Sequence, residues 1–352
     1  MKVFTYFVEP ARYSINLAQN VHKRNNIDYC FIKSTTYVEN KYINNKIFLD
    51  KLSFLARINL IFKIFNQNNF IIVNGYNNYV FLLNFILNIF SIKKKFIAIE
   101  SDSQYTTKKN LLLRFIKWIY LNIIFRNKYI LGFAGGSNSH KKLFYSYGMN
   151  KKRIFLMPMM VNNSNFFFKH KKKPVNFTFL FVGRIELEKG IESLIKVFIK
   201  HFKNTNVILK IVGSGSQLEL LKKQYNFNQI IFLGKLTDRK LINEYHNASC
   251  FVLPSVFEPW GLVVNEALSS SLPVITTKEV GASYDLIMNK NTGFICNNMR
   301  EFGFKMKYLY ENQDQVMKLS KNADNLMRNK WNYQFYEQCL RDVIIKIRNE
   351  SN

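Results

Sequence analysis

The stretch FVLPSVFEPWGLVVNE (residues 251–266) joins a short apolar run to a loop and a helical pattern. The apolar run predicts a buried strand, the loop opens at Glu258 and Pro259, and the helix that follows carries Glu266. A helix N-terminus behind such a loop offers partial positive charge and N–H groups to an anion. Two carboxylates at that place are better suited to accept hydrogen bonds from hydroxyl groups than to hold a phosphate. The stretch therefore predicts a site for a sugar phosphate.

The rest of the chain repeats this order of strand and helix. Strands are predicted at residues 3–8, 29–32, 70–73, 96–99 and 130–133, and again at 177–182, 207–212, 230–233, 250–253 and 273–276. Helices are predicted between them at 14–24, 52–66, 79–89, 110–126 and 139–147, and at 191–201, 217–225, 238–248 and around Glu266. Strands that alternate with helices of this length indicate βαβ units and parallel sheets. The predicted fold class is α/β, with two doubly wound domains.

The boundary between the two domains is predicted in a basic segment, residues 163–176, which contains three consecutive Lys and a Pro. This gives an N-terminal domain of residues 1–165 and a C-terminal domain of residues 170–330. Residues 331–352 form an aromatic-rich helical pattern with no strand after it, and we expect this helix to pack back on the N-terminal domain. A chain of 352 residues that is 48% hydrophobic can bury two such cores.

The cysteines and the N-terminal sequence indicate the cellular compartment in which the protein is expected. Four cysteines are scattered without a CxxC pair, and three of them lie in apolar surroundings that predict core positions. This usage favours a reducing compartment. The N-terminal sequence MKVFTYFVEP is typical of a first strand and lacks the apolar region of a signal peptide. A cytoplasmic location is the expectation.

Positive charge is the strongest feature of the composition. The chain has 51 Lys and Arg against 23 Asp and Glu, a net charge of +28. Residues 1–165 hold 24 basic and 6 acidic residues, a net of +18, and the remainder holds 27 and 17, a net of +10. Such a basic N-terminal half indicates an anionic partner: nucleic acid, a membrane surface or a phosphorylated acceptor.

Two apolar helical segments lie in this basic half. The segment 79–92 is too short to span a bilayer, which needs about 20 apolar residues, so a buried helix is expected. In the segment 110–128, Asn110, Arg114, Lys117 and Lys128 fall on one side of a helix and nearly all other residues are large and apolar. That pattern fits a helix in a membrane interface, with Trp118 and Tyr120 as anchors. It fits equally a core-facing helix with a narrow solvated stripe, and the sequence leaves both interpretations open.

Two further strand ends carry residues suited to phosphate chemistry. In FVGRIELEKG (residues 181–190), Gly183 permits a tight turn, Arg184 is a fork-shaped donor for phosphate oxygens and Lys189 is a second cation. In VGSG (residues 212–215), Gly213 and Gly215 form a second turn, and a nucleotide base or ribose could pack against it. This turn lacks the third glycine and the later acidic residue of a dinucleotide site, so NAD binding is disfavoured. Each of these features also has a purely structural explanation. The two glycine turns could be plain surface turns, Glu258 could cap the helix that follows it, and Glu266 could simply be solvated.

The spacing of Glu258 and Glu266 resembles the E-x7-E element of retaining GT-B glycosyltransferases. The C-terminal half resembles glycosyltransferase family 4, the glycosyl transferases group 1, because FVGR…EKG, IVGSG, LGKL and EPWGLVVNEAL occur in that family's order. The resemblance is firm over residues 177–295. The segments ESDS (100–103), GSNSHKKLFYSYG (136–148) and MPMMVNN (157–163) also look like family segments.

The resemblance implies a GT-B fold, with two Rossmann-like domains facing each other across a cleft, and a nucleotide-diphosphate sugar as donor, linked to UDP or GDP. Arg184, Lys189 and Glu258 would be the catalytic residues: the two cations hold the diphosphate in place of a metal ion, and Glu258 accepts from the donor sugar. Glu266 would bind the ribose, and the remaining donor-binding positions would be Gly183, Gly213, Leu236, Trp260, Gly261 and Leu262. Transfer would be of the hexosyltransferase type (EC 2.4), would retain the anomeric configuration, and would need no cofactor and no obligatory metal.

The N-terminal half departs from the family pattern. A glycine pair after the first strand is replaced by Glu9-Pro10-Ala11-Arg12, and a histidine after the fourth strand by Glu100-Ser101-Asp102. Glu100 and Asp102 are therefore candidates for contacts with the donor sugar or with the acceptor. His140 lies at a predicted helix start, where a surface or capping role is expected.

The leading hypothesis is a glycosyltransferase that extends a glycan or a lipid-linked acceptor in cell-surface polysaccharide or glycolipid synthesis. It would act in the cytoplasm, peripherally on the cytoplasmic face of the inner membrane through residues 110–128. The alternatives are a basic nucleic-acid- or membrane-binding protein without catalysis, and an inactive GT-B partner subunit. Nucleic acid is not an expected partner, because the charge is dispersed and no nucleic-acid-binding motif is present. An inactive subunit is disfavoured because the chain retains the charged residues of the donor site, Arg184, Lys189, Glu258 and Glu266.

Overall fold

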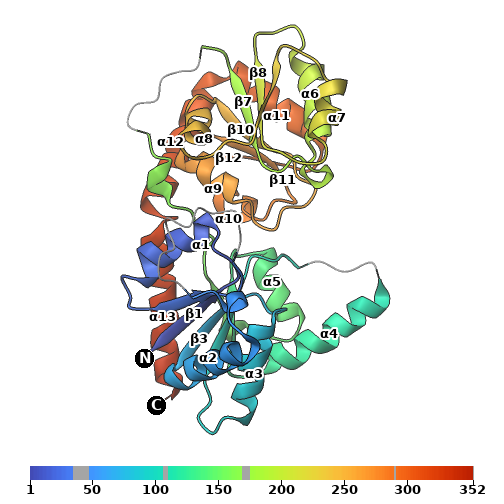
Figure 1. Cartoon of the computed structure of the whole chain (residues 1–352). Coiled ribbons are helices and arrows are strands. Elements are labelled where there is room, and N and C mark those ends of the chain that lie inside the picture. Colours follow the sequence, from blue (N-terminus) through green and yellow to red (C-terminus); the bar gives the residue numbers. More distant parts are fainter. Residues whose placement is uncertain (35–46, 106–109, 169–174, 289–290, 352) are drawn as a thin grey trace. The chain divides into compact units, whose positions relative to one another are not determined.

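The computed structural model describes residues 1–34, 47–105, 110–168, 175–288 and 291–351. The chain divides into two compact units (Figure 1). Unit 1 comprises Met1–Val161 and Tyr333–Asn352, and unit 2 comprises Asn162–Asn332. The consecutive lysines of the expected linker fall in residues 169–174, outside the described residues.

Unit 1 is built on a six-stranded parallel sheet in the order β2-β1-β3-β4-β5-β6. Its strands are β1 (Val3–Phe7), β2 (Asp28–Phe31), β3 (Phe70–Asn74), β4 (Phe96–Ser101), β5 (Ile130–Ala134) and β6 (Ile154–Leu156). The first five were predicted to within two residues at each end. The sixth was not predicted, because its three half-buried residues are too few to show a pattern.

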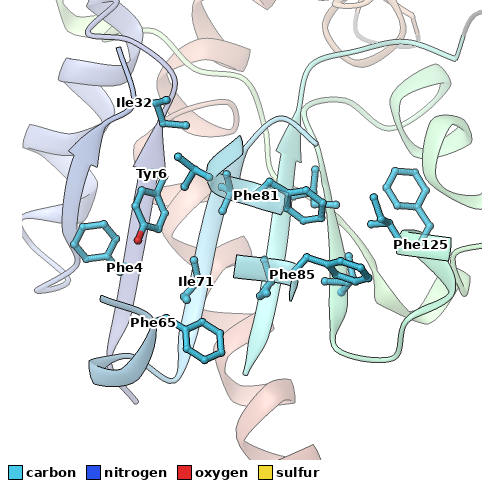
Figure 2. Close-up of a cluster of buried hydrophobic side chains, with 14 of the residues drawn as sticks. Phe4, Tyr6, Ile32, Phe65, Ile71, Phe81, Phe85 and Phe125 are labelled. Atoms are coloured by element: carbon cyan, nitrogen blue, oxygen red, sulfur yellow. The ribbon is translucent and has the colours of Figure 1, made fainter. Parts of the chain in front are cut away.

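Four helices cover one face of this sheet: α2 (Phe54–Gln67), α3 (Tyr79–Phe90), α4 (Leu111–Arg126) and α5 (Ser139–Ser146). Each of the first three begins at a side-chain cap, since Ser53, Asn78 and Asn110 accept hydrogen bonds from the N–H groups three residues later. Figure 2 shows Phe65, Phe81, Phe85 and Phe125 of these helices gathered over Phe4, Tyr6 and Ile71 of the strands. One continuous apolar cluster therefore joins the four helices to the sheet.

The opposite face of the sheet meets α1 (Arg12–Leu17), a π-helical turn (Ala18–His22) and α13 (Tyr333–Ser351). Thr5 lies between Phe4 and Tyr6 in β1, so its side chain points away from their cluster, and it reaches His22. The helix α13 contacts the π-helical turn and β6. Its apolar stripe, Tyr336, Leu340, Val343 and Ile347, is buried. Residues 333–351 thus complete the core of unit 1.

The expectation that the segment 79–92 is a buried helix is wrong for half of its surface. Val80, Phe81 and Phe85 of α3 are buried, but Leu82, Ile86 and Phe90 are 40% exposed or more. The segment is apolar on all sides, so periodicity could not show which side faces the core. In α4 only the second half contacts the core, through Leu121, Asn122, Ile124 and Phe125. The core-facing interpretation therefore fails for its first half.

Unit 2 holds a second six-stranded parallel sheet, in the order β12-β11-β10-β7-β8-β9. Its strands are β7 (Thr178–Val182), β8 (Ile208–Val212), β9 (Ile230–Gly234), β10 (Cys250–Leu253), β11 (Val274–Thr277) and β12 (Gly293–Cys296). Its helices are α6 (Ile191–Phe202), α7 (Leu218–Gln224), α8 (Asp238–His246), α9 (Leu262–Ser269), α10 (Ser283–Leu286), α11 (Met299–Glu311) and α12 (Gln313–Asn329). The predicted fold class, with two Rossmann-like α/β domains, is confirmed.

Each sheet reverses its winding direction once. In unit 1 the chain passes from β1 to β2 on one side and then continues from β3 on the other side of β1. In unit 2 it passes from β7 to β8 and β9, and β10 then pairs with the other edge of β7. Ligands of open parallel sheets bind beyond the carboxyl ends of the strands at such a reversal. The ends of β1 and β3, and of β7 and β10, are therefore the places to search for sites.

The four cysteines are all free thiols, and Cys30, Cys250 and Cys296 are buried as the sequence predicted. Among the described residues, none of the helices combines the length and the apolar content needed to pass through a bilayer.

We expect the stability of unit 1 to depend on pH through His22. This side chain is 1% exposed, and burial lowers its pKa to about 4, whereas an unfolded histidine titrates near 6.5. Between those two pH values only the unfolded chain binds the proton, so stability is complete above about pH 6.5 and falls by about 3 kcal/mol as the pH approaches 4. Urea unfolding at several pH values checks this. An equally steep pH dependence in a His22→Gln variant would contradict it.

Candidate functional sites

The loops after β7 and β10 meet at the winding reversal of unit 2. The loop after β7 forms a 3-10 turn, Leu187–Lys189, and ends at Gly190, which begins α6. The N–H of Val256 in the loop after β10 donates to the carbonyl of Glu188 at 2.9 Å. Gly190 has a left-handed backbone, and a Cβ there would lie 2.3 Å from the carbonyl oxygen of Pro254. The two loops are therefore packed backbone against backbone.

An ion pair joins the same two loops. Lys189 Nζ lies 2.5 Å from Glu258 Oε2, and the two side chains are 9% and 15% exposed. Glu258 is itself held to the loop after β11, because its N–H donates to the Glu279 carbonyl and its carbonyl accepts from the Gly281 N–H. Two of the three predicted catalytic residues thus hold each other in place. An ammonium has three donors, so Lys189 keeps donor capacity beyond this bond.

Arg184 lies in the same loop but is exposed to solvent. Its guanidinium is 3.0 Å from Glu188 Oε1, and its side chain is 70% exposed. Its neighbour Glu186 accepts hydrogen bonds from the side chain and the backbone N–H of Ser216 in the loop after β8. These bonds lower the pKa of Glu186. Glu186 fixes the loop that carries Arg184, while the guanidinium itself faces water.

Two of the three glycines predicted to line the donor site, Gly183 and Gly213, lie in turns that contact each other through their backbones. Gly183 donates its N–H to the Val212 carbonyl at 3.0 Å. Gly213 has φ +149°, and a Cβ there would lie 1.8 Å from the carbonyl oxygen of Gly183. No side chain fits between these turns, so the carboxyl ends of β7 and β8 form one continuous ledge of backbone.

The start of α9 contributes backbone groups rather than side chains. Trp260 is 2% exposed, its Nε1 donates to Asn265 Oδ1 at 2.8 Å, and its ring stacks on Trp331 at 5.8 Å. Its side chain is therefore part of the core. Gly261 is left-handed at φ +93° and begins the helix, and Leu262 follows in its first turn. N–H groups in a first helical turn precede the helix's own hydrogen-bond ladder, so they can bind an anion.

Glu266 lies one turn further into α9 and is half-buried. Tyr245, at the end of α8, donates its hydroxyl to Glu266 Oε2 at 2.8 Å. Burial and the Glu266 carboxylate raise the pKa of Tyr245, so its hydroxyl stays protonated and can only donate at neutral pH. This bond holds Glu266 in one orientation. Leu236, the predicted base contact, lies beyond β9 and is half-buried.

A separate pocket of about 230 Å³ lies at the winding reversal of unit 1. Its walls come from the ends of β1, β3 and β4, from α1, from residues 158–160 and from α13. The lining residues are Phe7, Val8, Tyr13, Leu17, Asn74, Gly75, Tyr76, Asn77, Glu100, Ser101, Asp102, Ser103, Pro158, Met159, Met160 and Tyr336. Glu100 and Asp102, the two predicted contacts of this unit, both belong to it.

Glu100 is held in this pocket by two neutral donors. Tyr336 donates its hydroxyl to Glu100 Oε1 at 2.9 Å, and Asn74 donates to the other oxygen. Burial raises the pKa of Glu100, and the two hydrogen bonds oppose that rise. Burial and the charges of Asp102 and Glu100 raise the pKa of Tyr13, which lines the same pocket. The pocket thus combines carboxylates with hydroxyl and amide donors, a lining suited to a polyhydroxylated group.

Several of these residues were not predicted from the sequence. Asn74 is the last residue of β3, and a polar residue at a strand end was a usable signal. Tyr336 is 236 positions from Glu100, and no local pattern links them. The expectation that His140 is a surface or capping residue is wrong: it is 1% exposed, because the second residue of α5 faces the core. The described residues contain no group of three or more His, Cys, Asp or Glu that could hold a metal ion.

The Lys189–Glu258 pair has a measurable consequence. We expect Lys189→Met to lower the free energy of unfolding because it leaves a largely buried carboxylate without its cation. Lys189→Met with Glu258→Gln should recover part of that loss, with a coupling energy of about 1–3 kcal/mol. Urea unfolding of the two single variants and the double variant measures it. The exposed pair Lys196–Glu192 in α6 is the control, and its coupling should be much smaller because water screens the two charges. Equal coupling in the two pairs would contradict the structural role.

Sequence comparison connects unit 2 with known enzymes. Residues 162–326, just under half of the chain, match the family model described as glycosyl transferases group 1. An uncharacterised glycosyltransferase of Methanocaldococcus jannaschii is 36% identical over 118 residues, which are 32% of this chain and 30% of that protein. The capsular polysaccharide biosynthesis glycosyltransferase CapM of Staphylococcus aureus is 30% identical over 190 residues, 52% of this chain and 49% of CapM. The matches thus span from about a third to half of these relatives.

Structural comparison covers almost the whole chain. The crystal structure of Anabaena HepE in complex with UDP superposes with a TM-score of 0.76 over 98% of this chain and 100% of HepE, at 15% identity. HepE has also been solved with UDP-glucose, and that structure gives a TM-score of 0.72. At this identity the likeness concerns the fold. By sequence, residues 162–326 therefore match the group 1 glycosyl transferases, and the whole chain has the GT-B fold of two Rossmann-like domains.

Proposed function

We propose that this chain is a retaining glycosyltransferase that moves a sugar from a nucleotide-diphosphate sugar to a glycan or a lipid-linked acceptor. The observation that carries the proposal is the Lys189–Glu258 pair, a cation and a carboxylate joined at the winding reversal of the unit that matches the group 1 glycosyl transferases. A nucleotide sugar has the complementary groups, a diphosphate and a hydroxylated ring, next to each other. The proposed reaction class is EC 2.4, as in family 4.

The diphosphate would lie between the loop after β7 and the start of α9. Lys189 is fixed by Glu258 and has donors left for a phosphate oxygen. Arg184 is exposed and carries a fork of donors that can leave Glu188 for a dianionic ligand. N–H groups at Gly261 and Leu262 add partial positive charge from the helix. Positive groups placed where charge develops on the leaving diphosphate can stabilise it without an obligatory metal ion.

The two glutamates would hold the two ends of the donor. Glu258, next to Lys189, would accept hydrogen bonds from the transferred sugar. Glu266, held by Tyr245, would accept from the ribose hydroxyls. The backbone ledge at Gly183 and Gly213 would support the nucleoside, since a backbone without side chains allows close approach. The base would reach the loop after β9 near Leu236.

The pocket of unit 1 would take the acceptor. Its volume of about 230 Å³ suits one sugar ring, and Glu100, Asp102 and Asn74 present acceptors and donors for hydroxyl groups. UDP is the favoured nucleotide because HepE, which shares the fold, has been solved with UDP and with UDP-glucose. A capsular or other surface glycan is the favoured product class because CapM acts in capsular polysaccharide biosynthesis.

A nucleotide panel tests donor binding. We expect UDP to raise the thermal midpoint more than GDP or ADP; at about 100 times its Kd, a ligand stabilises the folded state by about 2.7 kcal/mol. Arg184→Ala should weaken UDP binding roughly tenfold by removing a charge-assisted hydrogen bond. Arg328→Ala is the matched control, since it removes another exposed arginine of unit 2 that pairs with an acid four residues away. Absence of any nucleotide response, or equal losses in both variants, would refute donor binding at this site.

The ribose contact is tested with deoxynucleotides. Wild-type protein should bind UDP more tightly than 2′-deoxy-UDP or 3′-deoxy-UDP, and Glu266→Ala should abolish that difference. Tyr245→Phe removes only the hydroxyl that orients Glu266, and should weaken UDP binding roughly two- to tenfold, the effect of one hydrogen bond. Calorimetric titration measures both. Glu244→Ala, beside Tyr245 in α8 and paired with Lys210, is the control. Unchanged discrimination in Glu266→Ala would assign the ribose to another residue.

A further inference from the structure

Unit 1 exposes an unusual amount of apolar surface on three of its helices. Among the described residues, α2, α3, α4 and the turn after α3 carry 17 of the 30 large hydrophobic side chains that are exposed. Phe54, Leu55, Phe90, Ile92 and Leu111 are 71, 72, 81, 99 and 75% exposed. We name these exposed side chains of residues 54–123 the apolar face. Single exposed apolar residues are ordinary, but a contiguous group of this size marks a binding surface.

The three helices belong to one layer of unit 1. They all pack their inner sides on the same apolar cluster over the sheet (Figure 2). Helices α2 and α3 contact each other directly. Helix α4 is joined to the loop before α3 by the Tyr120 hydroxyl, which donates to the Tyr76 carbonyl at 2.7 Å, and by the Tyr76–Phe125 ring contact. Because the inner sides share one core, the outer sides point to the same side of the unit.

Helix α4 reaches furthest from the core. Figure 1 shows its N-terminal half extending beyond the rest of unit 1. From Leu111 to Ile119 every large apolar side chain is at least 40% exposed, and buried residues begin only at Leu121. Apolar surface of this extent in water is unfavourable by about 25 cal/mol per Å². A helix that keeps such a half outside its own core is suited to burying it in another apolar medium.

The charge around the apolar face is almost entirely positive. Residues 51–128 contain 12 Lys and Arg and only two acidic residues, Glu100 and Asp102. Both acids belong to the pocket at the ends of the strands, so neither lies on the three helices. Exposed basic residues lie on or next to the same helices: Lys63, Lys93, Lys94, Arg126 and Lys128. Long basic side chains can lay their stems on apolar surface and keep their charges at an interface.

A groove along α4 adds a place for one anionic group. It has a volume of about 400 Å³ and is lined by Arg114, Phe115 and Trp118 of α4 together with Tyr147 after α5. The Lys117 ammonium lies 5.4 Å from the centre of the Tyr147 ring. Cations set among aromatic rings suit a phosphate attached to an apolar chain.

We propose that the apolar face of α2, α3 and α4 binds the surface of an anionic phospholipid bilayer. The apolar side chains enter the headgroup region, Trp118 lies at the interface, and the basic residues contact lipid phosphates. A second copy of this chain is a poorer occupant, because it would bring the same positive charges into the contact. Bilayer binding needs no nucleotide sugar, so it can be tested independently of the proposed reaction.

Vesicle flotation tests the proposal with the full chain. We expect the protein to float with vesicles of phosphatidylcholine mixed with phosphatidylglycerol, and less with phosphatidylcholine alone or at high salt. Arg114→Gln with Lys117→Gln should weaken binding to the anionic vesicles roughly 10- to 30-fold, the effect of two cations at an anionic surface. Ile116→Glu with Trp118→Glu should abolish flotation. Leu220→Glu with Met317→Glu is the matched control, because these side chains of unit 2 are 58% and 52% exposed, and it should float like the wild type.

Tryptophan fluorescence gives a second readout that does not depend on a disruptive variant. The chain has three tryptophans, and Trp260 and Trp331 are 2% and 5% exposed, whereas Trp118 is 48% exposed. Anionic vesicles should shift the emission to shorter wavelength, and brominated acyl chains should quench it. Trp118→Phe should keep vesicle binding and lose both signals.

Three results would overturn the proposal. The first is equal flotation of the wild type and the Ile116→Glu, Trp118→Glu variant. The second is vesicle binding without any change in Trp118 emission. The third is a wild-type dimer in sedimentation velocity that the same variant converts to a monomer while vesicle binding is unchanged, which would assign the apolar face to a second copy.

Discussion

The right-handed crossover between parallel strands is the constraint from which the proposed sites follow. A chain that fills a sheet from the middle with crossovers of one hand has to reverse its winding direction once. In unit 2 this reversal makes β10 the neighbour of β7, although 67 residues separate Val182 from Cys250. The loops after these two strands therefore meet at the carboxyl ends of neighbouring strands, where ligands of open parallel sheets bind. Lys189 and Glu258 come from those loops, so their pairing is a product of the winding order.

The two units hold their carboxylates by different chemistry. Glu258 is paired with a cation at 2.5 Å, whereas Glu100 is held by the hydroxyl of Tyr336 and the amide of Asn74. Neutral donors stabilise an ionised carboxylate without cancelling its charge, so an ionised Glu100 disfavours phosphate in the pocket of unit 1 and favours a neutral hydroxylated group. The ion pair in unit 2 leaves the two loops close to neutral before a ligand binds. An incoming dianion then draws on Arg184 and the α9 N-terminus as the remaining positive groups.

The sequence predicted the central strands and the edge strands β2 and β9, but it missed the edge strands β6 and β12. The run 250–253 matches β10 because a strand buried on both faces is apolar throughout. The edge strands β6 and β12 are short and half-buried, so they show no such run. Both glutamates and both cations could be singled out from the sequence because each lies beside a turn or helix start with its own local pattern. Tyr245 and Tyr336 escaped prediction because their roles depend on contacts across the fold. The outward side of α3 escaped because its sequence is equally apolar on every side.

The position of α13 has a consequence for how the chain is made. Unit 1 is interrupted in the sequence by the whole of unit 2, and residues 333–352 return to it. A ribosome therefore releases the strands of the first sheet long before the helix that covers one of its faces. Unit 2 is continuous and can fold as soon as it emerges, while the pocket around Glu100 stays open until Tyr336 has been synthesised. Of these two units, the one whose synthesis begins first is completed last. Until α13 has been synthesised, the part of the sheet face that it covers is exposed and can bind a chaperone.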